Sequence, residues 1–169
     1  MESAQSFSEL IDRLAGGGVE FVVVGAVAAV IGGAPMTTFD LDVVFEPSAE
    51  NLERLLGVLE ALDARYADPA GREIRPDAGR LGTQGMHLLR TRLGRLDLFR
   101  EIGDGMGWTK VRERSHVLEL AGHEVRVLDL EAVLESKLAA GRDKDLAAIP
   151  LLRETLRLRR EKGPDPSPE

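Results

Sequence analysis

The order of apolar and polar residues predicts helices that alternate with strands. Phe21–Val24 is an unbroken apolar run, typical of a strand buried on both faces, and Gly25 ends it. After Ser48, a helix cap, leucines recur with helical spacing over 52–62. The other expected elements are a helix that a capping box at Ser6 opens and that runs to residue 14, helix 26–31, strand 39–45, hairpins 86–91/95–99 and 117–120/125–128, and helices 108–115, 129–140 (capped by Asp129) and 144–160. This order predicts an α/β (α+β) fold with a mixed β-sheet covered by helices.

The chain has 169 residues, a length that suits one domain. We expect a core over 1–128, a C-terminal helical segment over 129–162 packed on it, and a disordered tail over 163–169. Residues 68–82, rich in Arg, Gly and Pro, are expected to form a loop.

Composition narrows the function classes. The absence of cysteine excludes disulfide scaffolds, thiolate zinc sites and a cysteine nucleophile. No apolar run approaches the ~20 residues of a membrane helix, and the first residues do not resemble a secretory signal, so we expect a cytoplasmic protein without a membrane partner.

Charge is distributed unevenly. The net charge of −7 argues against a protein that coats DNA, yet residues 72–100 hold seven arginines against three acids, and residues 137–162 hold eight basic residues against four acids. Such segments can focus a polyanion such as a triphosphate or an RNA backbone, and the alternative is that they are ordinary solvated faces.

Three carboxylates carry the candidate chemistry. Asp40 and Asp42 alternate with an apolar residue on one expected strand, so they share a face, ~6.6 Å apart along it. If the strand that carries Asp97 is its neighbour, three carboxylates converge and can hold two divalent cations for phosphoryl or nucleotidyl transfer, with Asp97 as the base. The alternative is an exposed strand edge, with Asp97 paired to a neighbouring arginine. The strand–Gly25–helix turn offers free backbone N–H groups for a phosphate.

This order of motifs resembles the DNA polymerase β-like nucleotidyltransferase superfamily, which has a hydrophobic-Gly-(Gly/Ser) turn, an Asp-hydrophobic-Asp strand and a third strand aspartate. The segments 33–42, 127–131 and 137–146 look more narrowly like the small prokaryotic AbiEii-type nucleotidyltransferases of the toxin class.

The resemblance implies the nucleotidyltransferase fold and transfer of NMP from an NTP to a hydroxyl of RNA (such as a tRNA end) or of a protein, with Mg²⁺ or Mn²⁺. A cognate antitoxin would be a partner. Independently of the resemblance, the leucine stripe over 151–158 has the spacing of a core face and would equally suit a dimer or partner face. The implied site residues are Asp40, Asp42 and Asp97 as catalytic metal ligands, Gly25, Ala26, Thr37 and Thr38 for nucleotide, and Lys137, Arg142 and Lys144 for triphosphate or acceptor. For these last three, charges that stabilise helix ends are the alternative.

Three positions depart from the family pattern and bear on nucleotide affinity. Ala26 replaces a second Gly or Ser, Gly32 stands where relatives often have His, and Met36 stands where they often have Arg. Two other functions stay open: modification of a small molecule such as an antibiotic, for which the short chain leaves little room, and a non-catalytic module that binds nucleotide or a partner.

Overall fold

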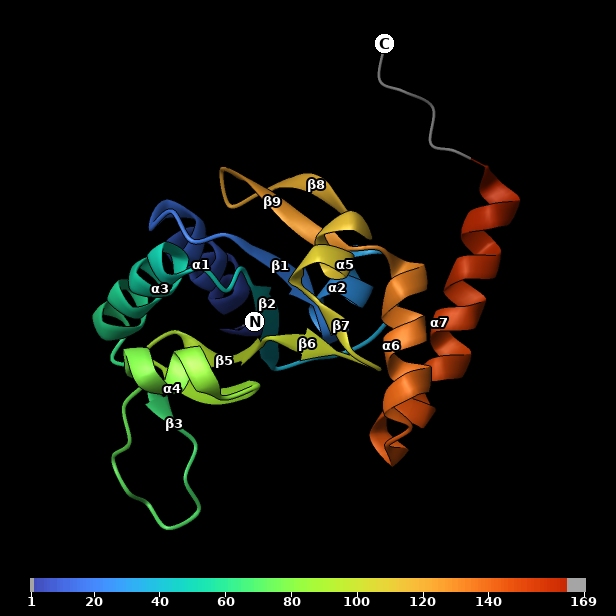
Figure 1. The fold of residues 1–169 in the computed structure, drawn as a ribbon. Coiled ribbons are helices and arrows are strands. Elements are labelled where there is room, and N and C mark those ends of the chain that lie inside the picture. The colour runs from blue at the N-terminus through green and yellow to red at the C-terminus, as the bar shows by residue number, and fades with distance from the viewer. Residues whose placement is uncertain (1, 164–169) are drawn as a thin grey trace.

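The structure, a computed structural model, describes residues 2–163 and is built on one seven-stranded mixed sheet (Figure 1). Its strands are β1 (Phe21–Val24), β2 (Asp40–Phe45), β3 (Arg65–Tyr66), β4 (Met86–Thr91), β5 (Gly94–Phe99), β8 (Ser115–Leu120) and β9 (His123–Leu128). They follow one another in the order β3-β4-β5-β2-β1-β9-β8. The pairs β1–β9 and β2–β5 are parallel, and the others are antiparallel. A separate short pair joins β6 (Glu101–Ile102) to β7 (Met106–Gly107).

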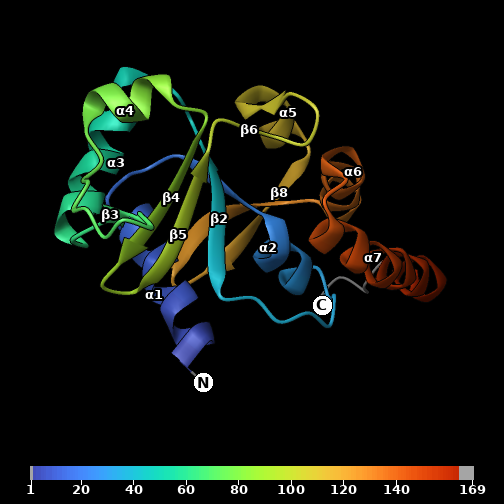
Figure 2. The ribbon, with the colours of Figure 1, turned by 90° about the horizontal axis from the view of Figure 1, so that it is seen from below.

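Helices surround this sheet. They are α1 (Glu2–Gly16), α2 (Gly25–Ile31), α3 (Ala49–Ala61), α4 (Ala78–Thr83), α5 (Trp108–Glu113), α6 (Leu130–Ala140) and α7 (Asp143–Lys162). Figures 1 and 2 place α3 and α4 at one end and the antiparallel pair α6–α7 at the other, with α2 between that pair and the sheet. The mixed α/β fold is thus confirmed. Within residues 2–163, no helix is both long and apolar enough to span a membrane.

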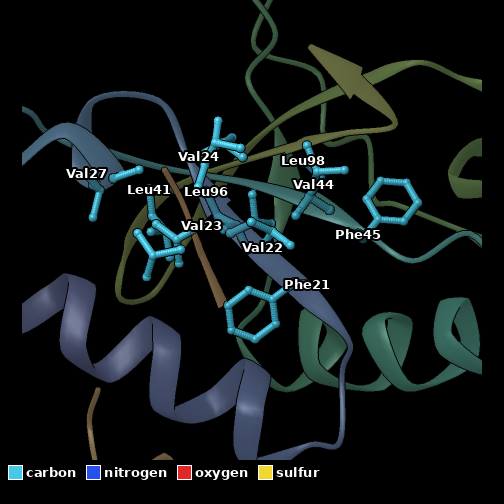
Figure 3. Packing of buried hydrophobic residues seen from close by; sticks show 14 of the residues in the cluster. Phe21, Val22, Val23, Val24, Val27, Leu41, Val44, Phe45, Leu96 and Leu98 are labelled. Atoms are coloured by element: carbon cyan, nitrogen blue, oxygen red, sulfur yellow. The ribbon is translucent and has the colours of Figure 1, made fainter. Parts of the chain in front are cut away.

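The central strand β1 is buried along its whole length, as its continuous apolar run predicts. Figure 3 shows Val22 and Val23 among the side chains of β2 and β5, and Phe21 pointing toward α1. The Ser48 side chain accepts the N–H of Asn51 and so caps α3. The leucines of α3 that face the sheet are buried, which confirms the leucine stripe as core.

Several expected boundaries were wrong. The 68–82 segment is not all loop, because Asp77 accepts the N–H of Arg80 and caps α4. Helix α1 begins at Glu2, before the start that was expected at Ser6. Ser115 begins β8 instead of ending a helix. Asp129 occupies the N-cap position of α6, but its carboxylate binds His116 Nδ1 at 2.7 Å and does not cap the backbone. The expected tail lies outside the described residues, except for Gly163.

Candidate active site

The three candidate acids lie on one face of two adjacent parallel strands. In the register of β2 against β5, Asp42 stands opposite Asp97 and Asp40 stands opposite Arg95. Since alternate residues of a strand share a face, Asp40 joins the Asp42–Asp97 pair. The register therefore provides the convergence of carboxylates that the candidate chemistry needs.

Burial and mutual repulsion disfavour the ionised forms of this cluster. Asp97 is 7% exposed and its Oδ1 has no hydrogen-bond partner. Burial, with the charges of Asp97 and Asp40, raises the pKa of Asp42 to about 7. Burial and the charge of Asp40 also raise the pKa of Asp97. The two side chains interact directly, so ionisation of either one disfavours ionisation of the other, and the pair retains a proton more readily than isolated carboxylates do.

Positive charge lies on two sides of the acids. Arg95 Nε is 3.3 Å from Asp40 Oδ1, and its charge favours the ionised form of Asp97. On the other side, the charge of Lys137 favours the ionised form of Asp42, and the charge of Lys144 favours the ionised form of Asp97. The basic segment of the α6–α7 junction thus lies within electrostatic reach of the acids.

Asp145 holds two of the three predicted basic residues at that junction. Its side chain is fully buried and binds Lys137 Nζ at 3.2 Å and Arg142 Nε at 2.6 Å. Burial tends to raise the pKa of Asp145, but the hydrogen bonds from Arg142 and Lys137 outweigh this effect and lower it. Lys144 is exposed and forms no ion pair with the side chains of residues 7–163. Asp145 is not among the predicted site residues, although its position three residues after Arg142 was a signal.

Gly25 lies against the acid cluster and cannot be replaced without disturbing it. Its φ is +64°, a left-handed conformation that favours glycine. A Cβ built on Gly25 falls within 3.0 Å of Asp42 Oδ2 and 3.1 Å from Asp42 Cγ. Ala26 follows it, half-buried, in the first turn of α2. The predicted phosphate turn and the predicted acids are thus direct neighbours.

The segment before β2 contains the two predicted threonines. The Thr38 hydroxyl donates to the Asp40 carbonyl at 3.3 Å, and the Asp40 N–H approaches Thr38 Oγ1 at 3.4 Å. Thr37 is exposed. Among the positions that depart from the family pattern, Gly32 is closely packed. Its would-be Cβ lies 3.3 Å from Leu130 Cδ1 of α6, so a larger side chain would push that methyl group aside.

The donor set suits a hard divalent cation in its chemistry. Carboxylate oxygens are the ligands that Mg²⁺ prefers, and Asp97 Oδ1 is an unpartnered oxygen in the middle of the cluster. Within residues 2–163, no three acidic or histidine side chains stand ready-made as a metal-binding group. Instead Asp40 contacts Arg95, and Asp42 contacts Asp97. A cation would therefore replace the retained proton and the Arg95 contact.

Comparison with known proteins gives matches among solved structures only; no family model and no curated sequence matches. The candidate nucleotidyltransferase TM1012 from Thermotoga maritima is 18% identical, with a TM-score of 0.54 over 92% of this chain and 93% of that one. The antibiotic-resistance factor ANT(2'')-Ia is 16% identical, with a TM-score of 0.59 over 96% and 88%; it has also been solved with adenylyl-2''-tobramycin. The lincosamide antibiotic adenylyltransferase LnuA, solved with lincomycin, is 12% identical, with a TM-score of 0.60 over 89% and 96%. These likenesses show that the chain has the nucleotidyltransferase fold.

Proposed function

We propose that the chain is a metal-dependent nucleotidyltransferase that transfers an NMP from an NTP to a hydroxyl acceptor. The observation that carries the proposal is the convergence of Asp40, Asp42 and Asp97 on β2 and β5, directly beside the Gly25 turn. This fold supports many substrates, so the acceptor must be argued from the site.

In the proposed reaction, the acceptor oxygen attacks the α-phosphorus of the NTP. The bond from that phosphorus to the bridging oxygen breaks, and pyrophosphate leaves with the electron pair. Asp97 accepts the proton of the acceptor hydroxyl, a role that suits a carboxylate with a raised pKa. Asp40, Asp42 and Asp97 would hold Mg²⁺ or Mn²⁺, which neutralises the charge that develops on the phosphate oxygens.

The remaining predicted residues have distinct roles in this proposal. The backbone N–H groups at Gly25 and Ala26 meet the triphosphate, and Thr37 and Thr38 flank it. Lys144, which forms no ion pair within the described part of the chain, is free to bind the triphosphate. Lys137 and Arg142 are already bound to Asp145, so they fix the junction and act on phosphate only from a distance.

Two classes of acceptor remain in the proposal. RNA, such as a tRNA end, or a protein hydroxyl would suit a cytoplasmic toxin with a cognate antitoxin, as the AbiEii-type resemblance implies. A small antibiotic is the second candidate, favoured by the likeness to ANT(2'')-Ia and LnuA. The short chain was expected to leave little room for such an acceptor. Because the chain covers 88% and 96% of those two proteins, its length is no argument against an antibiotic acceptor.

The test is transfer of label from each of the four α-³²P NTPs with Mg²⁺ or Mn²⁺, in the presence of total RNA, proteins or aminoglycosides. Asp42→Asn and Asp97→Asn should abolish transfer, whereas Glu60→Gln, which changes an exposed carboxylate of α3, should not. Transfer that persists in both aspartate variants would refute the mechanism. Calorimetric binding of an NTP without turnover on any acceptor would identify a non-catalytic binding module instead.

Mg²⁺ binding has a readout that does not depend on turnover. A ligand that binds only the folded chain raises its melting temperature, so Mg²⁺ should stabilise the wild type and Glu60→Gln but not Asp42→Asn. Equal stabilisation of all three proteins would exclude Asp42 as a ligand.

A further inference from the structure

The arginine-rich segment leaves uncancelled positive charge on the hairpin of β4 and β5. The four arginines that lie before this hairpin, in and after β3, all pair with carboxylates of the same region: Arg65 with Asp63 and Glu73, Arg72 with Asp68, Arg75 with Asp63, and Arg80 with Asp77. Arg90, on β4, is exposed, and its side chain forms no ion pair or hydrogen bond with the side chains that the structure describes, those of residues 7–163. The charge available to an anionic partner therefore lies on the hairpin.

Arg90 lies on the same face of the sheet as the candidate acids. In the strand registers, Arg90 stands opposite Arg95, which stands opposite Asp40. Since neighbouring strands are about 4.8 Å apart, the Cα atoms of Arg90 and Asp40 are on the order of 10 Å apart. In Figure 2, β4, β5 and β2 lie side by side and no helix crosses in front of β4 or β5. Met86 lies four residues before Arg90 on β4, so its side chain is on the same face, and it is 52% exposed.

The order of the strands separates the two substrates of the proposed reaction. Asp42 and the Gly25 turn, where the triphosphate is proposed to bind, lie on the β1–β2 side of the cluster. Asp97, the proposed base, lies on β5, and its other neighbour is β4. An acceptor whose hydroxyl meets Asp97 therefore extends over β4, where it meets Arg90 and the apolar side chain of Met86.

We propose that the exposed face of the β4–β5 hairpin binds the acceptor, and that the acceptor is a single-stranded nucleic acid. This inference rests on the proposed function and selects one acceptor class for the same site. A nucleic acid supplies a phosphate for Arg90, an apolar base for Met86 and a terminal hydroxyl for Asp97. A polycationic aminoglycoside would instead be repelled by the unpaired charge of Arg90.

The salt dependence of binding gives the proposal a quantitative form. Each phosphate that a cationic side chain neutralises contributes roughly 0.7 to the slope of log affinity against log salt for a single strand. Arg90→Ala should reduce this slope by about that amount, and Arg90→Glu should weaken binding by about tenfold or more near 0.1 M salt.

The experiment measures fluorescence anisotropy of a fluorescein-labelled single-stranded RNA of about 12 nucleotides, a usual site size, with the full chain, without NTP. The variants are Arg90→Ala and Arg90→Glu. The matched control is Arg153→Glu on α7, which changes another exposed arginine that forms no ion pair within the described residues. Melting temperatures verify that each variant is folded. We expect loss of affinity and slope in the Arg90 variants only.

Labelled-NTP transfer then separates the two hypotheses. If RNA binding depends on Arg90 but no acceptor is labelled, the binding surface stands and the proposed function fails. If an aminoglycoside or a protein is labelled and Arg90→Glu leaves that rate unchanged, the function stands and the surface proposal is overturned. RNA binding that is absent, or equal in Arg90→Glu and the wild type, also overturns it.

Discussion

Replacing Gly25 by alanine is a direct test of the contact between the turn and the acids. The backbone is left-handed there, with φ at +64°, which costs an alanine about 1 kcal/mol. The new methyl group would also lie within 3.0 Å of Asp42 Oδ2, so the carboxylate must move by on the order of 1 Å. Forcing Asp42 off its preferred rotamer adds about 1 kcal/mol. We therefore expect a loss of about 2 kcal/mol in the free energy of unfolding.

The same displacement should affect transfer far more than stability. Asp42 would leave its place opposite Asp97, and a misplacement of about 1 Å in a catalytic constellation typically costs on the order of 100-fold in rate. The assay is labelled-NTP transfer at saturating acceptor, combined with urea unfolding of the same preparations. Gly25→Ala should thus remain folded and be nearly inactive.

Gly122 provides the matched control for backbone strain. It lies in the β8–β9 turn with φ at +79°, and its would-be Cβ has no atom within 4 Å. Gly122→Ala should therefore lose only the backbone component, about 1 kcal/mol, and keep its transfer rate. Wild-type transfer in Gly25→Ala would refute the contact.

A double-mutant cycle isolates the clash from the backbone strain. Asp42→Gly removes both the carboxylate and the Cβ that the new methyl group would meet, so Gly25→Ala should cost only about 1 kcal/mol in that background. Costs that simply add would show that the two residues do not touch.

Three further predictions concern stability. Asp42→Asn in EDTA should raise the free energy of unfolding at pH 8 by roughly 1–2 kcal/mol, and should change it little below pH 4. The reason is that the pKa of Asp42 is raised to about 7 when folded and is near 3.8 when unfolded, so wild-type stability falls as pH rises between these values; a pH-independent difference would contradict this. The full pKa shift of Asp42 would correspond to ~4 kcal/mol, which solvent screening reduces. Asp145→Asn should lose about 3 kcal/mol in urea unfolding because it breaks a buried ion-pair group, whereas the exposed Asp143→Asn should change stability by less than about 0.5 kcal/mol; equal losses would refute the role of burial. Asn51→Ala should lose about 2–3 kcal/mol because it removes three part-buried hydrogen bonds between the Asn51 side chain and the backbone of Glu20 and Glu46. Transfer per folded molecule should be unchanged, and a loss of it would place Asn51 in the site.

Local patterns predicted the core strands because burial there follows directly from composition. A strand covered on both faces needs an unbroken apolar run, and Phe21–Val24 is such a run. The alternation around Asp40 and Asp42 likewise gave the face that these residues share. Alternation does not say which strands are neighbours, so the parallel pairing of β2 with β5 stayed conditional until the structure showed it.

The errors arose where a residue has a partner far away in the sequence, or where composition hides a short element. Asp129 has the sequence of a helix cap, but His116 of the adjacent strand takes its carboxylate. The helix α4 lies in a segment whose glycines, proline and arginines suggest a loop, although the cap from Asp77 was readable. Sequence shows which groups can bond, and the fold decides which of them meet.

The three basic residues of the α6–α7 junction show the same limit for the site. Lys137, Arg142 and Lys144 form one charge pattern in the sequence, with the same expected role. The structure gives them different roles, because the fully buried carboxylate of Asp145 needs cationic partners and forms ion pairs with Lys137 and Arg142. Only Lys144 keeps an uncommitted charge.

The pairing of charges around the acids suggests how the site would change when it binds its substrates. Without a cation, Asp40 is neutralised by Arg95 and the Asp42–Asp97 pair by a retained proton. A divalent cation would displace both, whereas the buried Asp145 group, with its own two cations, has no need to change. Arg95 would then be released on the same strand row as Arg90, and the positive charge of the β4–β5 hairpin would increase. Binding of metal and binding of an anionic acceptor should therefore favour each other, because the first frees a charge that the second uses.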